Sequence, residues 1–210
     1  MRLALLASVL LAATSVEASG QPAIHEYRPE IIVTSPRVLG FGAQFLYEQH
    51  LETGTLAPNE RIQGIGIVSP SFLHVRAALE VRQVQQPTVL EHRYIPTIFS
   101  TIPLGAGFEL RNRTRVEIRD INRAWSRRWQ NRSAFGHDID IAGQDVFTYV
   151  QLDLSYDSRF SALNRIDKAV GVRVPITSKS SIDTFLTRQD DTRRNPRVLI
   201  AGGALLRVAL

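Results

Sequence analysis

The chain has 210 residues and no cysteine, which excludes disulfides, thiolate metal sites and a cysteine nucleophile. Lysine is nearly absent as well: only Lys168 and Lys179 are lysines among the 25 basic residues, which leaves 23 arginines. A guanidinium is planar, always charged and suited to packing against carboxylates or aromatic rings, so this bias predicts packed ion pairs. With 44% hydrophobic and 21% charged residues, the composition excludes a helical membrane bundle, an acidic disordered chain and a collagen-like fibre.

A long apolar run occurs only at the beginning of the chain. Arg2 supplies a positive start, residues 3–13 are almost wholly apolar, and residues 16–18 form a cleavage pattern. This order predicts a secretory signal peptide over residues 1–18, cleaved to leave a single domain over residues 19–210. An amphipathic N-terminal helix is the alternative, but the run has no polar face. No later run approaches the roughly 20 residues that a membrane-spanning helix needs.

Beyond residue 23 the hydrophobic pattern has a period of two. Across residues 108–119 the even positions are mostly apolar and the odd positions are all Arg or Glu. Successive side chains of a β-strand point to opposite faces, so this segment has one mostly apolar face and one charged face. The same division recurs over residues 73–82, 165–174 and 197–210. The pattern predicts one all-β domain of long amphipathic strands.

Turn residues, such as the Ser-Pro pairs at 35–36 and 69–70, separate many of the segments. Bacterial single-chain barrels favour an even number of strands, although eleven segments are present. We therefore expect a single antiparallel transmembrane β-barrel of about 10–12 strands, with one segment split or misplaced and 60–68 the weakest. The predicted strands are 24–34, 37–50, 60–68, 71–84, 88–100, 104–119, 125–139, 145–156, 162–174, 178–189 and 196–210.

The alternation of apolar and charged residues does not by itself show which face of the strands contacts water. A soluble lipocalin-like barrel has its apolar face inside, whereas an outer-membrane barrel has it against lipid. The membrane is favoured by segments longer than the roughly 5–6 residues usual in soluble folds, by the signal peptide, and by the mixed signs on the charged face. An arginine facing lipid near the midplane costs about 2–4 kcal/mol, so the four arginines at odd positions of 108–119 are expected to face inward. A soluble periplasmic lipocalin-like binding barrel is the alternative.

Several motifs resemble an uncharacterised bacterial outer-membrane family, catalogued as domain of unknown function 2490. The motifs are LEHRY at residues 90–94, RNRTRVEIR at 111–119, WQNR at 129–132 and NRI at 164–166. The resemblance covers about residues 25–210, including a final strand that reaches the C-terminus. It implies an outer-membrane β-barrel in bacteria with a double membrane. It implies no known activity, substrate or catalytic residue.

The C-terminal segment departs from the bacterial barrel pattern in one respect. Such barrels commonly end on an aromatic residue that the barrel-assembly machinery reads, whereas this chain ends in Leu210. Gly203 and the alternating apolar positions are retained, so we expect the machinery to read the C-terminal strand through a weakened signal. The expected location is the bacterial cell outer membrane, with membrane lipid around the folded chain.

Charged residues at inward positions are expected to neutralise one another in the lumen. The arginines are interleaved with Glu and Asp and are not gathered in one patch, so the net charge of +5 does not indicate nucleic-acid binding. The residues of this predicted lumen network are Arg76, Glu80, Glu91, Arg93, Glu109, Arg111, Arg113, Arg115, Glu117, Arg128, Arg132, Arg165, Asp167 and Arg173.

Two functions are consistent with such a network. In the first, the network closes the lumen and the barrel is a structural or interaction protein that displays its loops; in the second, it lines a narrow pore that prefers small anions. An outer-membrane lipid-modifying enzyme is a third alternative. Ser71, His74 and Glu80 have the residue types of a catalytic triad, but nothing in their spacing predicts the geometry of one.

We expect no cofactor and no metal. The aspartates around Gly143 are expected to form a plain hairpin, with calcium binding as the alternative.

Many aromatic residues lie near the ends of the predicted strands. Amphipathic rings at these positions could form girdles at the membrane interfaces, although ordinary packing is an alternative explanation. The residues are Tyr27, Phe41, Tyr47, Tyr94, Phe99, Trp125 and Tyr156.

Overall fold

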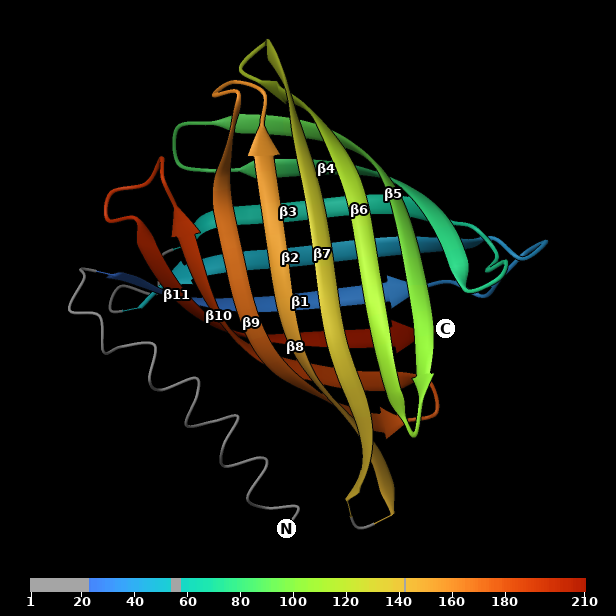
Figure 1. Ribbon diagram of the computed structural model, residues 1–210. Coiled ribbons are helices and arrows are strands. Elements are labelled where there is room, and N and C mark those ends of the chain that lie inside the picture. The colour runs from blue at the N-terminus through green and yellow to red at the C-terminus, as the bar shows by residue number, and fades with distance from the viewer. Residues whose placement is uncertain (1–22, 54–57, 142) are drawn as a thin grey trace.

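The structure, a computed structural model, describes residues 23–53, 58–141 and 143–210. The described residues form a closed all-β barrel without a helix (Figure 1), and they include no helix long and apolar enough to cross a membrane. The all-β barrel that the alternation predicts is therefore confirmed. The strands are β1 (Ala23–Thr34), β2 (Gly42–Glu52), β3 (Pro58–Val68), β4 (Val75–Gln85), β5 (Leu90–Gly105), β6 (Phe108–Ile121), β7 (Ala124–Ile141), β8 (Gln144–Asp157), β9 (Ala162–Thr177), β10 (Ser180–Asp191) and β11 (Val198–Ala209).

Eleven strands close the barrel, and the expectation of an even number is wrong. Each strand pairs antiparallel with the next, and β1 closes the ring by pairing parallel with β11 from Ala23 opposite Val198 to Thr34 opposite Ala209. A ring in which all neighbours are antiparallel needs an even number of strands, so an odd number leaves one parallel pair. Residues 60–68 need no reassignment because they form most of β3, paired with β2 and β4.

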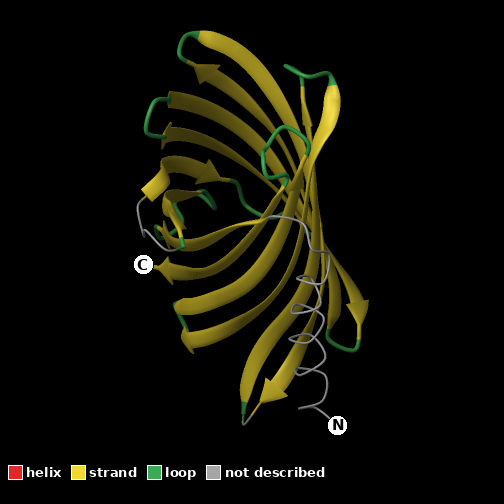
Figure 2. Cartoon of the chain, turned by 90° about the vertical axis from the view of Figure 1, so that its left-hand side faces the viewer, coloured by secondary structure: helices red, strands yellow, loops and turns green. Residues whose placement is uncertain are grey.

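The parallel closure places the two ends of the described chain at opposite ends of the barrel. We call the end that holds Ala23 the N-terminal end and the end that holds Leu210 the C-terminal end. The connections at both ends are short, the longest being the seven residues 35–41 (Figure 2). The expected signal peptide, residues 1–18, lies outside the described residues.

Three predicted strands begin four or five residues too early; the segment 104–119 is a strand only from Phe108 onward, because residues 104 and 105 end β5. The segments 37–50 and 71–84 are strands only from Gly42 and Val75 onward, because tight turns precede them. Leu39 and Leu73 have φ values of 51° and 47° within these turns, a left-handed conformation that ends a strand. The apolar residues of the turns extend the alternation of the strands that follow, which explains the error.

Aromatic rings lie flat against the inner wall where it carries glycine. A Cβ atom on Gly171 would lie 2.3 Å from the ring of Tyr149, and one on Gly203 would lie 2.2 Å from the ring of Phe185. In the register, Tyr149 is opposite Gly171 and Phe185 is opposite Gly203. The glycines are therefore required for close packing of these rings across neighbouring strands.

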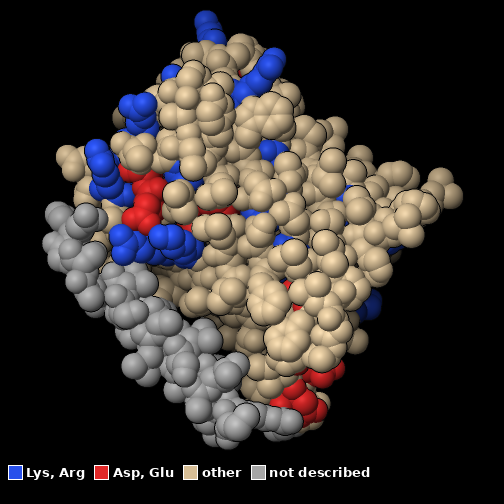
Figure 3. Space-filling model, in the orientation of Figure 1, with Lys and Arg blue, Asp and Glu red and all other residues tan. Residues whose placement is uncertain are grey.

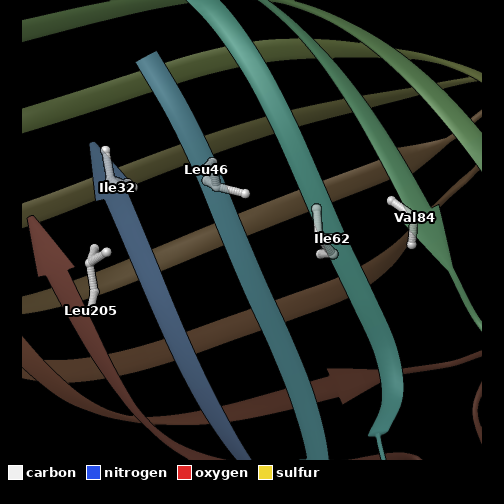
Figure 4. Close-up of a cluster of buried hydrophobic side chains, with 5 residues drawn as sticks. All are labelled: Ile32, Leu46, Ile62, Val84 and Leu205. Carbon is white, nitrogen blue, oxygen red and sulfur yellow. The ribbon is translucent and has the colours of Figure 1, made fainter. Parts of the chain in front are cut away.

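The inner wall is not polar throughout. Five buried aliphatic side chains form a cluster on adjoining strands at the β11–β1 closure and on β2, β3 and β4 (Figure 4). They share the inward face with charged residues: Ile32, for example, follows Glu26 and Arg28 at alternate positions of β1. This apolar part of the lumen was not predicted. The five residues are Ile32, Leu46, Ile62, Val84 and Leu205.

We predict that Gly203→Ala destabilises the barrel, because the new methyl group collides with Phe185 and with the Arg28 carbonyl oxygen, 2.8 Å away. Overpacking of this kind costs about 1–3 kcal/mol. Its neighbour Gly202 is the matched control: nothing lies within 4 Å of a Cβ atom there, so Gly202→Ala should leave the free energy of unfolding unchanged or raise it slightly. Urea unfolding of both variants in detergent micelles tests the difference, and equal stabilities would contradict the packing we describe.

Candidate functional site

The two faces of each strand have opposite chemistry. Along β5, Glu91 and Arg93 are buried, while Leu90, Tyr94 and Ile98 are exposed. Since the strands form a closed ring, side chains covered by their neighbours lie in the lumen and exposed side chains point outward. Figure 3 shows one side of this outer surface, on which charged residues lie mostly towards the edges. Exposed outward-facing residues include Phe45, Ile65, Ile67, Leu79, Val81, Ile98, Ile102, Phe135, Val150 and Leu152.

All of the predicted network residues lie on the inward face. Each occupies the same alternating positions of its strand as the buried residues do. The structure does not join them into one network. Most belong to ion pairs that fall into separate groups on neighbouring strands. The largest group lies on β5, β6, β7 and β8.

This largest group contains a closed ring of six alternating charges, which we call the charge ring. Cross-strand register assembles it: Glu117 lies opposite Arg128, and Arg128 lies opposite Asp157. In order, the ion pairs join Glu91 to Arg93 (2.8 Å), Arg93 to Glu117 (4.0 Å), Glu117 to Arg128 (3.7 Å), Arg128 to Asp157 (3.3 Å), Asp157 to Arg119 (2.9 Å) and Arg119 back to Glu91.

The carboxylates of the charge ring are withdrawn from solvent. The side chains of Glu117 and Asp157 are both 0% exposed. Arg115 adds a further contact to Glu117 at 2.8 Å, and Arg159 adds one to Asp157 at 2.8 Å. Burial of an isolated carboxylate is prohibitively unfavourable, so these groups depend on the guanidinium groups around them.

Two further aspartates each hold two arginines. Asp153 contacts Arg132 at 2.9 Å and Arg113 at 3.5 Å. Asp183 contacts Arg173 at 3.0 Å and Arg207 at 3.7 Å, and it accepts a hydrogen bond of 2.9 Å from the Tyr149 hydroxyl. Each group has one more positive than negative charge.

The remaining predicted residues form local pairs or stack on rings. Arg165 contacts Asp167 at 2.6 Å, and Glu109 pairs with Arg111. The Arg111 guanidinium lies 3.8 Å from the centroid of the Phe147 ring. Glu80 pairs with Arg82, which the prediction omitted. Arg76 forms no ion pair within the described residues; its guanidinium lies 4.8 Å from the Phe99 ring centroid.

Several central residues are absent from the predicted network. Asp153, Asp157 and Asp183 lie on the inward face without having been predicted there, whereas Arg119 and Arg207 were expected on the charged face of their strands but not as members of the network. The alternation could have identified two of these residues. Asp153 lies at an odd, inward-facing position of the predicted strand 145–156, and Asp157 lies at the next such position beyond Ser155, one residue past the predicted end. Which carboxylate meets which arginine depends on strand register, which the alternation does not specify.

The residue types of a catalytic triad are not assembled. Ser71 and His74 lie in the exposed turn between β3 and β4, whereas Glu80 lies on the inward face of β4 with Arg82 at 2.5 Å. His74 and Glu80 are six residue steps apart along nearly extended chain, which corresponds to about 20 Å. The alternation over residues 73–82 predicts that His74 lies on the charged face of a strand, but its φ of 64° places it in the turn instead. Within the described ranges no group of three or more His, Asp or Glu residues could hold a metal ion.

Four of the predicted girdle residues gather towards the N-terminal end. Tyr27, Tyr94, Trp125 and Tyr156 are exposed on the outward face there, and the rings of Tyr94 and Trp125 stack with centroids 6.3 Å apart. Phe99 differs, because it points inward beneath Arg76.

Comparison of the chain with protein-family models and with curated proteins finds no match.

We predict that Glu117→Gln strongly destabilises the barrel, because it removes the carboxylate that Arg93, Arg115 and Arg128 share. Loss of one partner from a buried ion pair costs about 3–5 kcal/mol. Urea unfolding in micelles measures the loss.

The matched control is Asp190→Asn. Asp190 pairs with Arg188 at 3.0 Å and Lys168 at 3.8 Å on the outward face, where the side chain of Lys168 is 63% exposed. Exposed pairs contribute about 0–1 kcal/mol, so this variant should unfold nearly as the parent does. A loss of equal size in the two variants would show that the charge ring has no special role in stability.

Proposed function

We propose that the chain is a structural barrel of the bacterial outer membrane whose lumen is closed by the Arg–carboxylate network. The observation that carries the proposal is the separation of chemistry between the two faces: buried, paired charges inside and exposed large hydrophobic side chains outside. A soluble lipocalin-like barrel has the opposite arrangement, with an apolar interior and a polar exterior.

The membrane surroundings are supported by energetics and by length. Soluble monomers rarely expose large contiguous apolar patches, whereas lipid is a favourable solvent for an outer face of Ile, Leu, Val and Phe. Crossing the hydrocarbon core takes roughly 9–11 residues of tilted strand, and the strands here have 11 to 18 residues. The girdle of Tyr27, Tyr94, Trp125 and Tyr156 suits an interface between hydrocarbon and water.

A structural role for the lumen is supported by the burial of the charge ring. A water-filled pore leaves the charges that line it hydrated, whereas Glu117 and Asp157 are completely covered by neighbouring side chains. The connections are too short for large displayed loops. We therefore assign the network to closing and stabilising the barrel, with no catalytic role.

A narrow anion-preferring pore is the second candidate, and the excess of arginine favours it. The charge ring with Arg115 and Arg159 holds five guanidinium groups against three carboxylates. Asp153 and Asp183 each add a further positive excess, and Arg76 has no ion-pair partner among the described residues. A conducting path past these groups would select small anions.

Location and assembly follow from the same proposal. The resemblance to the family catalogued as domain of unknown function 2490 agrees with an outer-membrane barrel. We propose that the signal peptide directs export and that β11, which pairs with both β10 and β1, is the strand read by the barrel-assembly machinery.

Planar-bilayer recording tests the closed lumen. The parent protein should give no conductance steps. The double variant Arg93→Ala/Glu117→Ala removes both charges of one pair in the charge ring and should produce steps with anion preference, because the remaining charges there are mostly guanidinium groups. The outward-facing double variant Lys168→Ala/Asp190→Ala is the control and should stay silent. Anion-selective steps from the parent that fall with Arg113→Glu would instead establish the pore.

Cell fractionation tests the location. The expressed chain should be recovered in the outer-membrane pellet, and its mobility on gels should change on heating, as the mobility of a stable barrel does. Recovery from the soluble periplasm would contradict the membrane assignment.

A further inference from the structure

A short sequence motif occurs twice at the C-terminal end of the barrel. Residues 35–43 read SPRVLGFGA, and residues 69–77 read SPSFLHVRA. Both have Ser-Pro, then an apolar residue and Leu, then an apolar residue and Ala at the same spacing. The first lies between β1 and β2 and the second between β3 and β4. We call residues 35–41 and 69–75 the paired tips.

The two tips have the same hydrogen bonds. Ser35 Oγ donates to the Pro36 carbonyl oxygen and accepts from the Ala43 amide, and Ser69 Oγ does the same with Pro70 and Ala77. Further out, the amides and carbonyl oxygens of Val38 and Phe41 bond reciprocally, as do those of Phe72 and Val75. Each tip therefore satisfies much of its own backbone.

Both tips present a leucine in a left-handed conformation. Leu39 and Gly40 have φ values of 51° and 82°, and Leu73 and His74 have values of 47° and 64°, as a type I′ turn requires. Gly, Asn and Asp are the residues usual in such turns, because a leucine there is strained. Leu39 is nevertheless 93% exposed and Leu73 is 78% exposed. Strained, exposed leucines at equivalent positions indicate a contact outside the chain.

The tips lie side by side and continue the outer apolar face. A Cβ atom on Gly40 would be 3.1 Å from the Pro70 ring, so the two turns are in contact. They project together at the right-hand side of Figure 1. The exposed side chains of Phe45 on β2 and Val75 on β4 connect them to the outward faces of these strands.

We propose that the paired tips insert into the lipid bilayer and anchor this part of the C-terminal end. The proposal rests on the outer-membrane location proposed above. Lipid suits the tips better than a polar partner because their exposed residues are mostly apolar and much of their backbone is hydrogen-bonded within each tip. Only Arg37 and His74 are ionisable, and the long aliphatic stem of Arg37 allows its guanidinium to reach the headgroups. The Ser178-Lys179 turn at the same end is polar and lacks these features.

Single cysteines in this cysteine-free chain test the proposal. Leu39→Cys and Leu73→Cys are labelled with an environment-sensitive fluorophore, and the protein is reconstituted into phosphatidylcholine vesicles with or without brominated acyl chains. Ile98→Cys, at an exposed outward position of β5, reports the lipid face of the barrel, and Ser178→Cys reports a polar turn at the same end. Leu39→Asn is made as a second variant, because asparagine tolerates the left-handed conformation.

We expect blue-shifted emission and strong quenching by the brominated lipid at positions 39, 73 and 98, and neither effect at 178. Leu39→Asn should lower the quenching of a label at position 73, because half of the anchor is lost, while the label at 98 is unaffected. Quenching at 98 with water-like emission at 39 and 73 overturns the proposal and leaves the barrel in the membrane. Failure of quenching at 98 would instead overturn the membrane location itself.

Discussion

Pairing of buried guanidinium and carboxylate groups is the constraint on which the barrel depends. A closed barrel directs about half of its strand residues into the lumen, and here many of those residues are charged. Such groups are stable away from water only when each meets opposite charges in good geometry. The charge ring on β5 to β8 supplies these opposite charges, since Glu117 and Asp157 each contact at least three arginines. Arginine is suited to this task because one planar group can contact two carboxylates, as Arg119 does with Glu91 and Asp157.

The same constraint explains how the rest of the lumen is filled. On β8 to β11, which also carry the ion pairs of Asp183, Tyr149 and Phe185 lie flat over Gly171 and Gly203. On β11 and β1 to β4 a cluster of aliphatic side chains shares the inner wall with further ion pairs, such as those of Arg28 with Glu26 and Arg82 with Glu80 (Figure 4). Charged, aromatic and aliphatic side chains thus share the inner wall of the barrel.

Much of this fold could be predicted from the sequence because a period of two is a local property. The face on which Arg113 or Arg173 lies follows from its neighbours in the chain, and the structure places both in the lumen. Features that depend on how distant strands meet could not be predicted. The parallel pairing of β1 with β11 is one, and the partnership of Asp157 with Arg119, which lie 38 residues apart, is another. The turns at Leu39 and Leu73 were wrongly predicted to be parts of strands, because their apolar residues continue the alternation of the neighbouring strand. Their left-handed backbone conformation is not visible in that pattern.

A spin-label scan along β6, from Phe108 to Ile121, in lipid vesicles tests the central claim most directly. Oxygen, which partitions into lipid, and a water-soluble nickel complex are used as relaxation agents. The account predicts that oxygen relaxes labels at even positions in the middle of the strand, such as Thr114 and Val116, and that labels at the odd positions Arg113 and Arg115 are relaxed by neither agent. Relaxation of the odd positions by nickel would show a water-filled lumen, and relaxation of those positions by oxygen would show that the charged face is not inside.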